Sequence, residues 1–501
     1  MLSRNNIFLL LILLYFALRI WNLTLLPIYN DEAIYLDWGW RETTVPGLLF
    51  YSLYDAKQPL LMWVFGISQK IFSDPLFAGR IVSVLCGLLT LLGIYAIGKK
   101  YFTKRAALLA SLLYIAIPIF SFFDRQALME SAIAAVGVWS GYFAIRFFEL
   151  RTAKPAFMLG LILGIGYFIK STALGFMAIF SLLALIDMVK NRQRQTLKNS
   201  FYALLGFLTI TSLLLIQPQQ WDPLQSTNRW VLTLGEVLKF PMLHWLGNIM
   251  ADTQITIFLA SPLILLLSIA GIALARKKRP QIILAVWFLG TLAIQVIFAR
   301  VIIQRYLVSF LPLITLFAAS SMVFAISKKK ALGITLAILT IIFPLYFTVL
   351  QIQNPIAYFS LQTKMTNYSN QYDYVGGITS GYGISDAVNL LNKDIGNNRA
   401  VIGLEVNTGT PESAIFTYFH KNPKVTVAYL DERILGNNVL KYDCLDTGEP
   451  TYFISRGNQM GGLGKFFSTI AYLKNRYNNN VIGIHKLKTN CKGKVAKLNQ
   501  T

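Results

Sequence analysis

The stretch "LFAGRIVSVLCGLLTLLGIYAIGKKYFTKR", residues 76–105, decides the class of this protein. Residues 76–98 form an apolar run that is long enough to cross a ~30 Å hydrocarbon core as a helix. The basic segment "KKYFTKR" at 99–105 follows at once, and basic loops of this kind stay on the cytoplasmic side of a membrane. An apolar run followed by a basic loop therefore predicts a membrane span with a defined orientation.

The same pattern recurs along the chain, which has 501 residues, 55% of them hydrophobic and 14% charged. A soluble enzyme with one anchor would concentrate its apolar residues in a single run. We therefore predict a mainly α, polytopic transmembrane helical bundle with about eleven spans. The predicted spans are 7–26, 76–98, 106–122, 128–148, 156–170, 171–189, 200–217, 254–275, 281–299, 306–326 and 331–350.

The net charge of +23 resides largely in short loops between these runs, at 99–105, 190–198, 276–279 and 328–330. This distribution argues against nucleic acid as a partner and indicates the positive-inside pattern. We expect a multi-pass protein of the plasma or inner membrane. Its N-terminus is then cytoplasmic, and the chain after about residue 354 is extracytoplasmic.

Residues 354–501 differ in composition from residues 1–353, the predicted transmembrane domain. Four segments are typical of β-strands, and two segments between them are typical of short helices. These residues therefore predict an extracytoplasmic soluble α/β domain. The strand segments are "RAVIGLEV", "KVTVAYL", "PTYFISR" and "VIGIHKL", and the helix segments are "SDAVNLLNKD" and "ESAIFTYFH".

Cys444 and Cys491 both fall in this predicted domain. Two cysteines in an oxidising compartment can pair, or they can remain two unrelated thiols. The sequence leaves both alternatives open.

Two predicted outer loops, 27–75 and 218–253, carry aromatic residues and prolines that suit the membrane interface. The segment "PLLMWVFGISQKIF" at 59–72 is too short and too interrupted to span comfortably. We expect it to form a helix that lies on or dips into the outer interface.

Charged groups gather at the predicted outer ends of the spans and in the outer loops. Such charges are costly at membrane depth and are usually functional. Each also has an ordinary structural explanation, since adjacent acids often cap a helix, acid–base neighbours form ion pairs and a lone histidine is often simply packed. We consider as catalytic candidates Asp31, Glu32 and Glu130, and as substrate-binding candidates Lys57, Asp124, Arg125, Lys170, His244 and Arg305.

Several of these residues lie in segments that resemble glycosyltransferase family 39 of the C-type membrane glycosyltransferases. This group includes the protein O-mannosyltransferases and the bacterial lipid A aminoarabinose transferase. The matching segments follow the family's order over roughly residues 10–320. They are "LRIWNLTLLPIYNDEAIY", the run from "KQPLLMW" to "GKKYF", "FDRQALMESAIA", "GIGYFIKSTAL" and "QRYLVSFLPLI".

The resemblance implies transfer of a sugar from a polyprenyl-phosphate donor on the outer face of the membrane. It places the family's first-loop acid at Asp31, with Glu32 beside it, and the late arginine at Arg305. It also places family basic positions at Lys57 and Arg125, and an acid at Glu130. Metal binding is associated with some members. However, Ala56 stands where an acid would precede Lys57, so no metal ligand is carried over and a divalent metal stays open.

The chemistry of a phosphate-linked sugar suggests a mechanism. The phosphate is already a good leaving group, whereas the acceptor hydroxyl must lose a proton as it attacks the anomeric carbon. We expect Asp31 to be the base and the cations to stabilise the departing phosphate, with inversion at the anomeric carbon. The acceptor is a lipid, a glycan or a protein.

Two alternatives differ in class. A transporter or flippase for lipid-linked sugars predicts paired halves and broken helices near the midplane, and the sequence has neither signature. An oligosaccharyltransferase or polysaccharide polymerase of similar architecture is the other alternative. The tryptophan–aspartate signature of oligosaccharyltransferases is absent from residues 354–501, which contain no tryptophan.

Overall fold

The computed structural model describes residues 4–191, 194–221, 230–275, 278–430, 441–457, 460–475, 477, 481–489 and 494–497. Parts of the predicted loops 190–198, 218–253 and 276–279 lie outside these residues, as does Cys491. The chain forms two compact units. The first comprises Met1–Leu23, Val45–Val64 and Arg80–Tyr368, and the second comprises Thr24–Thr44, Phe65–Gly79 and Ser369–Thr501.

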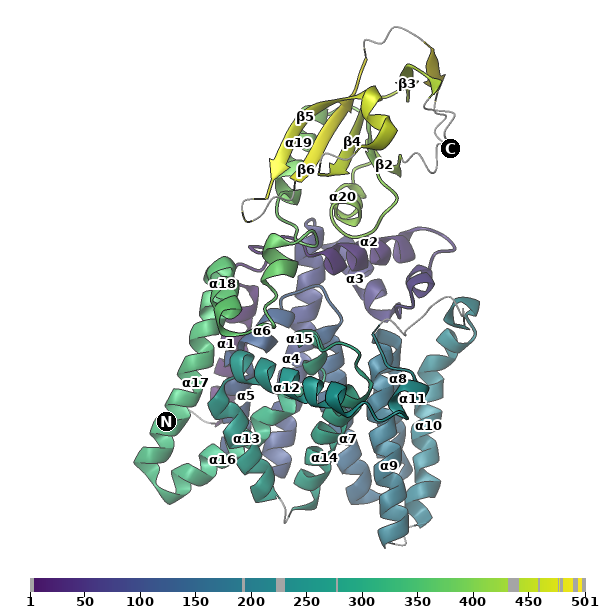
Figure 1. The fold of residues 1–501 in the computed structure, drawn as a ribbon. Coiled ribbons are helices and arrows are strands. Elements are labelled where there is room, and N and C mark those ends of the chain that lie inside the picture. The colour runs from purple at the N-terminus through teal and green to yellow at the C-terminus, as the bar shows by residue number, and fades with distance from the viewer. Residues whose placement is uncertain are drawn as a thin grey trace. The chain divides into compact units, whose positions relative to one another are not determined.

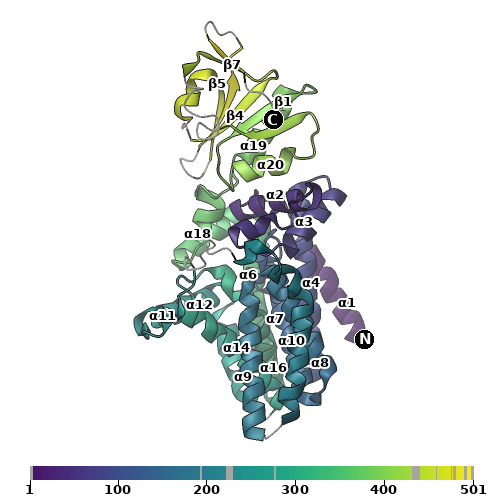
Figure 2. The same cartoon turned by 90° about the vertical axis from the view of Figure 1, so that its right-hand side faces the viewer.

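The first unit is built from helices, many of which run side by side (Figures 1 and 2). Several ends follow from capping chemistry; Thr103, for example, accepts a hydrogen bond from the Ala106 amide at the start of α5. The helices are α1 (Arg4–Ile20), α4 (Pro75–Tyr101), α5 (Lys104–Ala116), α6 (Pro118–Phe123), α7 (Glu130–Leu150), α8 (Ala153–Ile169), α9 (Leu174–Asn191), α10 (Arg194–Leu215), α11 (Leu234–Val237), α12 (Met242–Leu259), α13 (Pro262–Leu274), α14 (Arg279–Phe298), α15 (Gln304–Leu307), α16 (Ile314–Lys328), α17 (Lys330–Gln353) and α18 (Pro355–Met365), with short η1 (Tyr51–Asp55), η2 (Ser171–Ala173), η3 (Pro218–Trp221) and η6 (Leu311–Leu313).

The multi-span, mainly helical architecture is confirmed, but the predicted count of about eleven spans is not. Among the described residues, seven helices are long and apolar enough to cross a membrane, or up to eight if the bent pair α12 and α13 is one span. Three shorter apolar helices, Asn6–Ile20, Leu60–Ile71 and Ala153–Ile169, accompany them.

Several predicted spans were wrong in their limits or continuity. The span over 306–326, for example, is divided between α15, which ends at Leu307, and α16, which begins at Ile314. The helix expected over 7–26 ends at Ile20. The span over 106–122 is interrupted at Ile117, and the span over 254–275 is interrupted where α12 and α13 meet at an angle of 114°. Both interruptions precede a proline, Pro118 and Pro262, which disfavours helical backbone in the residue before it.

Glycines allow close packing within the helical unit. A Cβ on Gly160 of α8 would lie 2.0 Å from the Ala203 carbonyl oxygen of α10. A Cβ on Gly206 of α10 would lie 2.3 Å from the Phe157 oxygen of α8. Small residues at such positions let helix backbones approach each other in a membrane, where apolar burial alone provides little drive for association.

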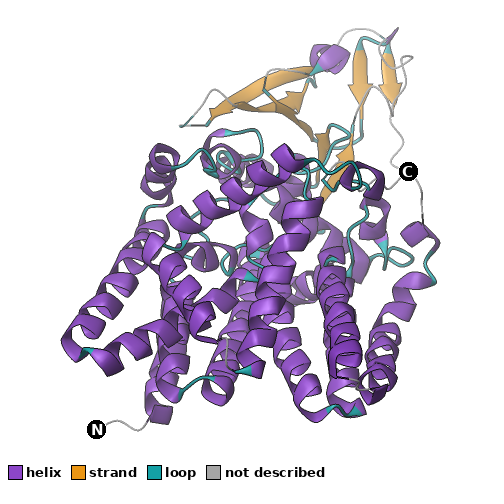
Figure 3. Cartoon of the chain, turned by 60° about the horizontal axis from the view of Figure 1, so that its bottom comes forward, coloured by secondary structure: helices purple, strands orange, loops and turns teal. Residues whose placement is uncertain are grey.

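The second unit contains α2 (Asn30–Thr44), the later part of α3 (Leu60–Ile71) and an α/β fold after residue 369. The strands of this fold are orange in Figure 3. The main sheet has the order β2-β1-β4-β6-β5, with β1 parallel to β2 and β4, and β6 antiparallel to β4 and β5. A second sheet pairs β3 with β7. The elements are α19 (Ile384–Ile395), β1 (Ala400–Leu404), α20 (Glu412–Phe419), β2 (Val425–Tyr429), β3 (Cys444–Asp446), β4 (Thr451–Arg456), β5 (Phe467–Lys474), β6 (Val481–Leu487) and β7 (Val495–Lys497).

All four predicted strand segments and both predicted helices occur in this fold, as β1, β2, β4, β6, α19 and α20. Strands β3, β5 and β7 were not predicted from the sequence. Strand β5 exposes most of its side chains at the sheet edge, so it lacks the buried apolar run that marks β1 and β4. Apolar residues of α19 and α20, including Leu391 and Phe419, pack with β1 in one core.

Cys444 in β3 is buried and belongs to a disulfide bond. Its predicted pairing with Cys491 concerns a residue outside the described ranges and stays a prediction. The domain boundary at residue 354 also stays a prediction.

Candidate functional site

A carboxylate and two cations meet in the helical unit at Glu130, Lys170 and Arg305. The Lys170 Nζ atom lies 2.9 Å from Glu130 Oε1, and Arg305 Nε lies 4.0 Å from the same oxygen. The Glu130 side chain is only 3% exposed, whereas the Lys170 and Arg305 side chains are 21% and 23% exposed. With one negative and two positive charges, the cluster retains a partly accessible net positive charge that suits an anion.

Each of these three residues lies at the end of a helix or in a short helix. Glu130 is the first residue of α7, where a carboxylate interacts favourably with the helix dipole. Lys170 adopts an extended conformation between α8 and η2, and Arg305 lies in the short helix α15. The Lys170 ammonium also lies 5.6 Å from the centre of the Tyr306 ring.

Arg125 and Glu130 do not lie in one helix, although they are only five residues apart in the chain. Helix α7 begins at Glu130, and Arg125 lies in the turn after α6. Its amide donates to the Phe122 carbonyl. The two residues therefore do not follow the angular spacing of a single helix.

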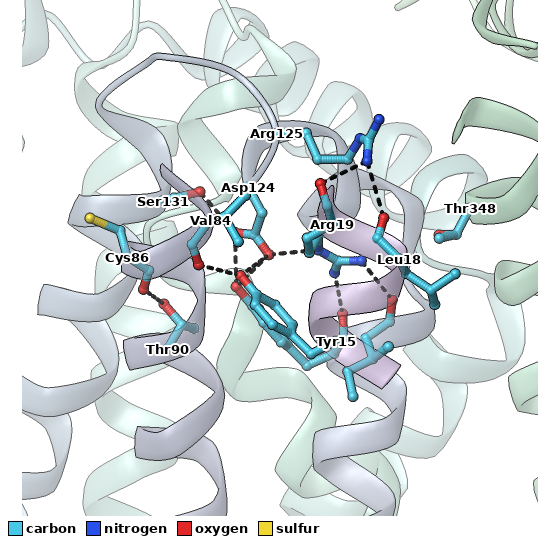
Figure 4. Close-up of polar contacts among 12 residues, drawn as sticks. Tyr15, Leu18, Arg19, Val84, Cys86, Thr90, Asp124, Arg125, Ser131 and Thr348 are labelled. Carbon is cyan, nitrogen blue, oxygen red and sulfur yellow. Dashed lines mark hydrogen bonds and ion pairs between the residues drawn. The ribbon is translucent and has the colours of Figure 1, made fainter. Parts of the chain in front are cut away.

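Asp124 lies inside a dense hydrogen-bond network rather than in the Glu130 cluster (Figure 4). Its carboxylate accepts from Arg19 Nε at 3.0 Å, from Tyr114 at 3.0 Å and from Ser131 at 2.8 Å. Asp124 and Arg19 are 1% and 0% exposed. A buried ion pair needs such additional hydrogen bonds to offset desolvation, so these contacts favour a structural role for Asp124.

Arg125 turns away from Asp124 toward the end of α1 (Figure 4). Its guanidinium donates to four backbone carbonyls, those of Leu18, Arg19, Trp21 and Asn22, at 2.7–3.2 Å. The last carbonyls of a helix lack partners within the helix, and a basic side chain can satisfy them. These contacts favour a helix cap over a phosphate ligand.

His244 has comparable structural partners. Its Nε2 atom lies 2.9 Å from the Ala299 carbonyl oxygen, and Asn248 of the same helix donates to the Val296 and Ala299 carbonyls at 2.9 Å. Trp245 donates to the Ile297 carbonyl at 3.1 Å. The first turns of α12 thus satisfy the C-terminal carbonyls of α14, which is sufficient to account for His244.

Lys57 is the most exposed of the candidate cations, at 38% of its side chain. Its Nζ atom is 3.9 Å from Asp55 Oδ2, a weak surface contact. Ala56 before it ends η1 in a left-handed conformation, with φ of 53°. Lys57 is therefore available to a ligand in a way that Arg125 is not.

Asp31 and Glu32 lie in the first turn of α2, in the second unit. Glu32 is fully buried, and its Oε2 atom accepts from the Tyr29 amide at 3.0 Å. Helix α2 begins at Asn30, and the capping contact to the Tyr29 amide comes from Glu32. The Glu32 carboxylate is therefore engaged in capping α2, whereas the Asp31 side chain is only partly buried.

The structure therefore brings together Glu130, Lys170 and Arg305, and gives Asp124, Arg125 and His244 separate structural partners. The sequence analysis did not select Arg80, which is fully buried in α4 and donates to the Leu23 carbonyl at 2.8 Å. A lone charge within an apolar run is the signal that could have identified it. Among the described residues, no group of three or more His, Cys, Asp or Glu side chains could hold a metal ion.

Comparisons with known proteins agree with this architecture. Residues 56–219 match the protein family described as dolichyl-phosphate-mannose-protein mannosyltransferase. No curated protein sequence matches the chain. The chain shares its fold with ArnT from Cupriavidus metallidurans. The apo structure of ArnT superposes with a TM-score of 0.58 and 14% identity, over 95% of this chain and 97% of ArnT.

The structure of the same ArnT bound to undecaprenyl phosphate gives a TM-score of 0.55 and 13% identity over the same shares of the two chains. An oligosaccharyltransferase from Archaeoglobus fulgidus, in complex with zinc and sulfate, gives 0.47 and 14% identity over 84% of this chain and 62% of its own. The latter likeness is too weak to favour either class of enzyme. The family match over residues 56–219 and the ArnT fold both agree with the resemblance to the C-type membrane glycosyltransferases, and the family match indicates a glycosyltransferase.

Proposed function

We propose that this glycosyltransferase transfers a monosaccharide from a polyprenyl-phosphate donor to an acceptor hydroxyl on the outer face of the membrane, with inversion. The acceptor is a lipid, a glycan or a protein. The donor class is supported by the undecaprenyl phosphate bound to ArnT, whose fold this chain shares. The outer face is supported by the basic loops at 99–105 and 328–330, which the positive-inside rule assigns to the cytoplasm.

The observation that carries the proposal is the cluster of Glu130, Lys170 and Arg305. Lys170 and Arg305 are partly exposed cations, and Glu130 is the buried carboxylate between them. Negative charge develops on the lipid phosphate as the sugar leaves, and cations already in place stabilise it without reorganisation. In this role Glu130 orients the two cations, and exposed Lys57 is a further phosphate ligand.

Asp31 is the proposed general base. It matches the family's first-loop acid, and capping occupies its neighbour Glu32. As the acceptor oxygen attacks the anomeric carbon, the Asp31 carboxylate takes the hydroxyl proton, and the bond from the sugar to the phosphate oxygen breaks. A single displacement of this kind inverts the anomeric centre.

The test is sugar transfer in detergent from a polyprenyl-phosphate monosaccharide, measured for the wild type and Asp31→Asn. Loss of a general base should lower turnover by about 10²- to 10⁴-fold. Asp386→Asn is a matched control, because Asp386 also lies in the first turn of a helix in the second unit, α19. It should keep normal turnover. Near-normal turnover of Asp31→Asn would reject Asp31 as the base.

The same assay separates the alternative functions. A wild-type protein that uses only a preassembled oligosaccharide donor would be an oligosaccharyltransferase or a polymerase. Movement of the donor across a vesicle membrane without transfer would indicate a flippase. Either result would overturn the proposed reaction.

A further inference from the structure

The first turn of α2 is held by the segments that follow residue 369 within the second unit. The Asn30 amide donates to the Thr379 carbonyl at 3.0 Å, and the Thr410 amide donates to Asn30 Oδ1 at 3.0 Å. Thr417 of α20 also donates to the Ala33 carbonyl at 3.3 Å. Two loops and one helix from the C-terminal part thus contact one turn of α2.

Two glycines permit this close approach. A Cβ on Gly409 would lie 1.8 Å from Asn30 Oδ1, and a Cβ on Gly381 would lie 1.9 Å from the Ile28 carbonyl oxygen. Neither distance is compatible with a real side chain. Gly409 also has a φ of +96°, a conformation that favours glycine. Both loops therefore require glycine where they meet the start of α2.

The Asn30 side chain connects this docking to the neighbouring acid. Because its Oδ1 atom accepts from Thr410, its Nδ2 atom is the donor end of the amide, and this atom lies 3.5 Å from Asp31 Oδ1. The order along the chain of contacts is the Thr410 amide, the Asn30 side chain and the Asp31 carboxylate. A backbone amide of the C-terminal part thereby sets which way the Asn30 amide faces.

We propose that Asn30 is a positioning residue that orients the Asp31 carboxylate and tunes its basicity, and that the Gly409–Thr410 loop locks Asn30 in that orientation. The inference rests on the proposed role of Asp31 as the base. It gives the C-terminal α/β fold a part in catalysis, because this fold supplies the lock.

The test is the pH dependence of kcat for Asn30→Ala and Asn30→Asp. Removal of a hydrogen-bond donor next to a carboxylate favours its protonated form. The acidic limb of the kcat–pH profile, where turnover falls as Asp31 becomes protonated, should therefore move to higher pH in Asn30→Ala. A second carboxylate should move it further in Asn30→Asp. Asn30→Ala should also lower kcat by roughly tenfold, the effect of one hydrogen bond to a charged group, with little change in donor KM. A purely structural role would not displace the limb.

Other charges near α2 have partners of their own, which are the same in the wild type and in the Asn30 variants. Burial raises the pKa of Asp37 to about 6, so the acidic limb of each variant is compared with that of the wild type, in which Asp37 titrates as well. On α2, Glu32 accepts from Tyr29, and Asp37 pairs with Arg41. On the elements that pack against α2, Lys70 donates to the Thr43 carbonyl, Glu412 pairs with Arg456, His420 stacks on Trp40 and Lys421 donates to the Phe72 carbonyl.

Gly409→Ala tests the lock and has a matched control. Gly448 also has a positive φ, +74°, but a Cβ there would meet nothing within 4 Å. Gly409→Ala should reproduce the lower kcat and the shifted limb, whereas Gly448→Ala should behave as the wild type. Combined with Asn30→Ala, Gly409→Ala should lower kcat little further, since the clashing Asn30 oxygen is gone. The backbone strain of alanine at a positive φ remains, and Gly448→Ala shares it.

The outcomes separate the inference from the function on which it rests. If Asp31→Asn retains turnover, the base assignment fails and the inference fails with it. If Asp31→Asn is inactive but Asn30→Ala keeps the wild-type limb and kcat, the inference alone is overturned. If Gly409→Ala does not fold, the folded Asn30 variants still decide the result. Their pH profiles and the hydrogen exchange of residues 30–33 are then compared with those of the wild type.

Discussion

At the scale of single residues, the structure separates cations that the sequence presents as equivalent. Arg125 donates to four carbonyls at the end of α1, whereas Arg305 faces Glu130 with nearly a quarter of its side chain exposed. A guanidinium satisfied by backbone oxygens has few donors left for a phosphate, but a partly exposed one beside a lysine can bind it. Of these two arginines, Arg305 is therefore the better candidate phosphate ligand.

We expect Arg305→Ala to reduce donor efficiency about ten- to a hundred-fold, because a charge-assisted hydrogen bond contributes roughly 1.5–3 kcal/mol. Arg305→Lys should recover only part of this, since an ammonium cannot form the bidentate fork. Transfer rates against donor concentration provide the measurement. Arg300→Ala is the control, because Arg300 binds Glu236 on the surface. Equal donor efficiency in Arg305→Ala and the wild type would reject Arg305 as a phosphate ligand.

His420 leads to a prediction about pH. Its ring stacks on Trp40 with centres 4.0 Å apart, and burial, together with the nearby charges of Lys421 and Arg41, lowers the pKa of His420 to about 3. The folded state therefore favours the neutral imidazole. The resulting stabilisation is complete above pH ~6.5, the unfolded value, and is lost as the pH falls toward 3.

His420→Phe keeps an aromatic ring against Trp40 and removes the titration. We expect the variant to lose less thermal stability than the wild type between pH 7 and pH 4. The midpoint of thermal unfolding against pH, in the same detergent, is the measurement. Parallel curves for the two proteins would show that His420 does not contribute to acid sensitivity.

At the scale of elements, one buried carboxylate joins four helix ends. Asp187 of α9 accepts from Arg151 after α7 at 3.2 Å, from Thr196 of α10 at 2.7 Å and from Arg279 of α14 at 2.6 Å. Its side chain is 4% exposed. Because it has several donors on different helices, Asp187 acts as a cross-link between them rather than as a simple surface ion pair.

We expect Asp187→Asn to destabilise the protein by roughly 2–4 kcal/mol. Loss of one partner of a buried pair costs ~3–5 kcal/mol, and partial exposure of the two arginines reduces this figure. Glu149→Gln is the control, since Glu149 is about a third exposed, pairs with Arg146, and keeps as glutamine an oxygen that can accept from the Tyr101 hydroxyl. It should change stability by at most ~1 kcal/mol. Thermal unfolding in detergent compares the two, and similar midpoints would contradict the cross-link.

At the scale of the whole molecule, the distribution of basic loops makes a prediction about topology. Lys329 lies between α16 and α17 in a basic loop, and Asn398 lies between α19 and β1. Both positions are exposed. The positive-inside rule assigns the loop with Lys329 to the cytoplasm and, by the proposed topology, the α/β fold to the outside.

Lys329→Cys and Asn398→Cys test this assignment with a thiol reagent that cannot cross membranes. In intact cells the reagent should label Asn398→Cys, and it should label Lys329→Cys only after the membrane is permeabilised. The reverse pattern would invert the topology and remove the outer-face reaction. Equal labelling after permeabilisation confirms that both positions react.

The sequence by itself determined the elements whose signal is local. Apolar runs and basic loops indicated a multi-span helical protein, and the strands β1, β2, β4 and β6 were evident from short apolar segments. The edge strand β5 was not, because its side chains are largely exposed and carry no such pattern. The bend between α12 and α13 was also missed, because an apolar run continues through it.

Only the tertiary structure decided which charges act together. Glu130 and Lys170 lie 40 residues apart in the chain, yet their side chains form an ion pair. The neighbours Asp124 and Arg125 bind different groups, since Asp124 accepts from the Arg19 side chain and Arg125 donates to backbone carbonyls at the end of α1. Composition and periodicity describe how each segment meets water or lipid. The partner of a buried charge depends instead on which distant helix end packs beside it. A buried charge must find such a partner, because leaving it unpaired after desolvation costs several kcal/mol.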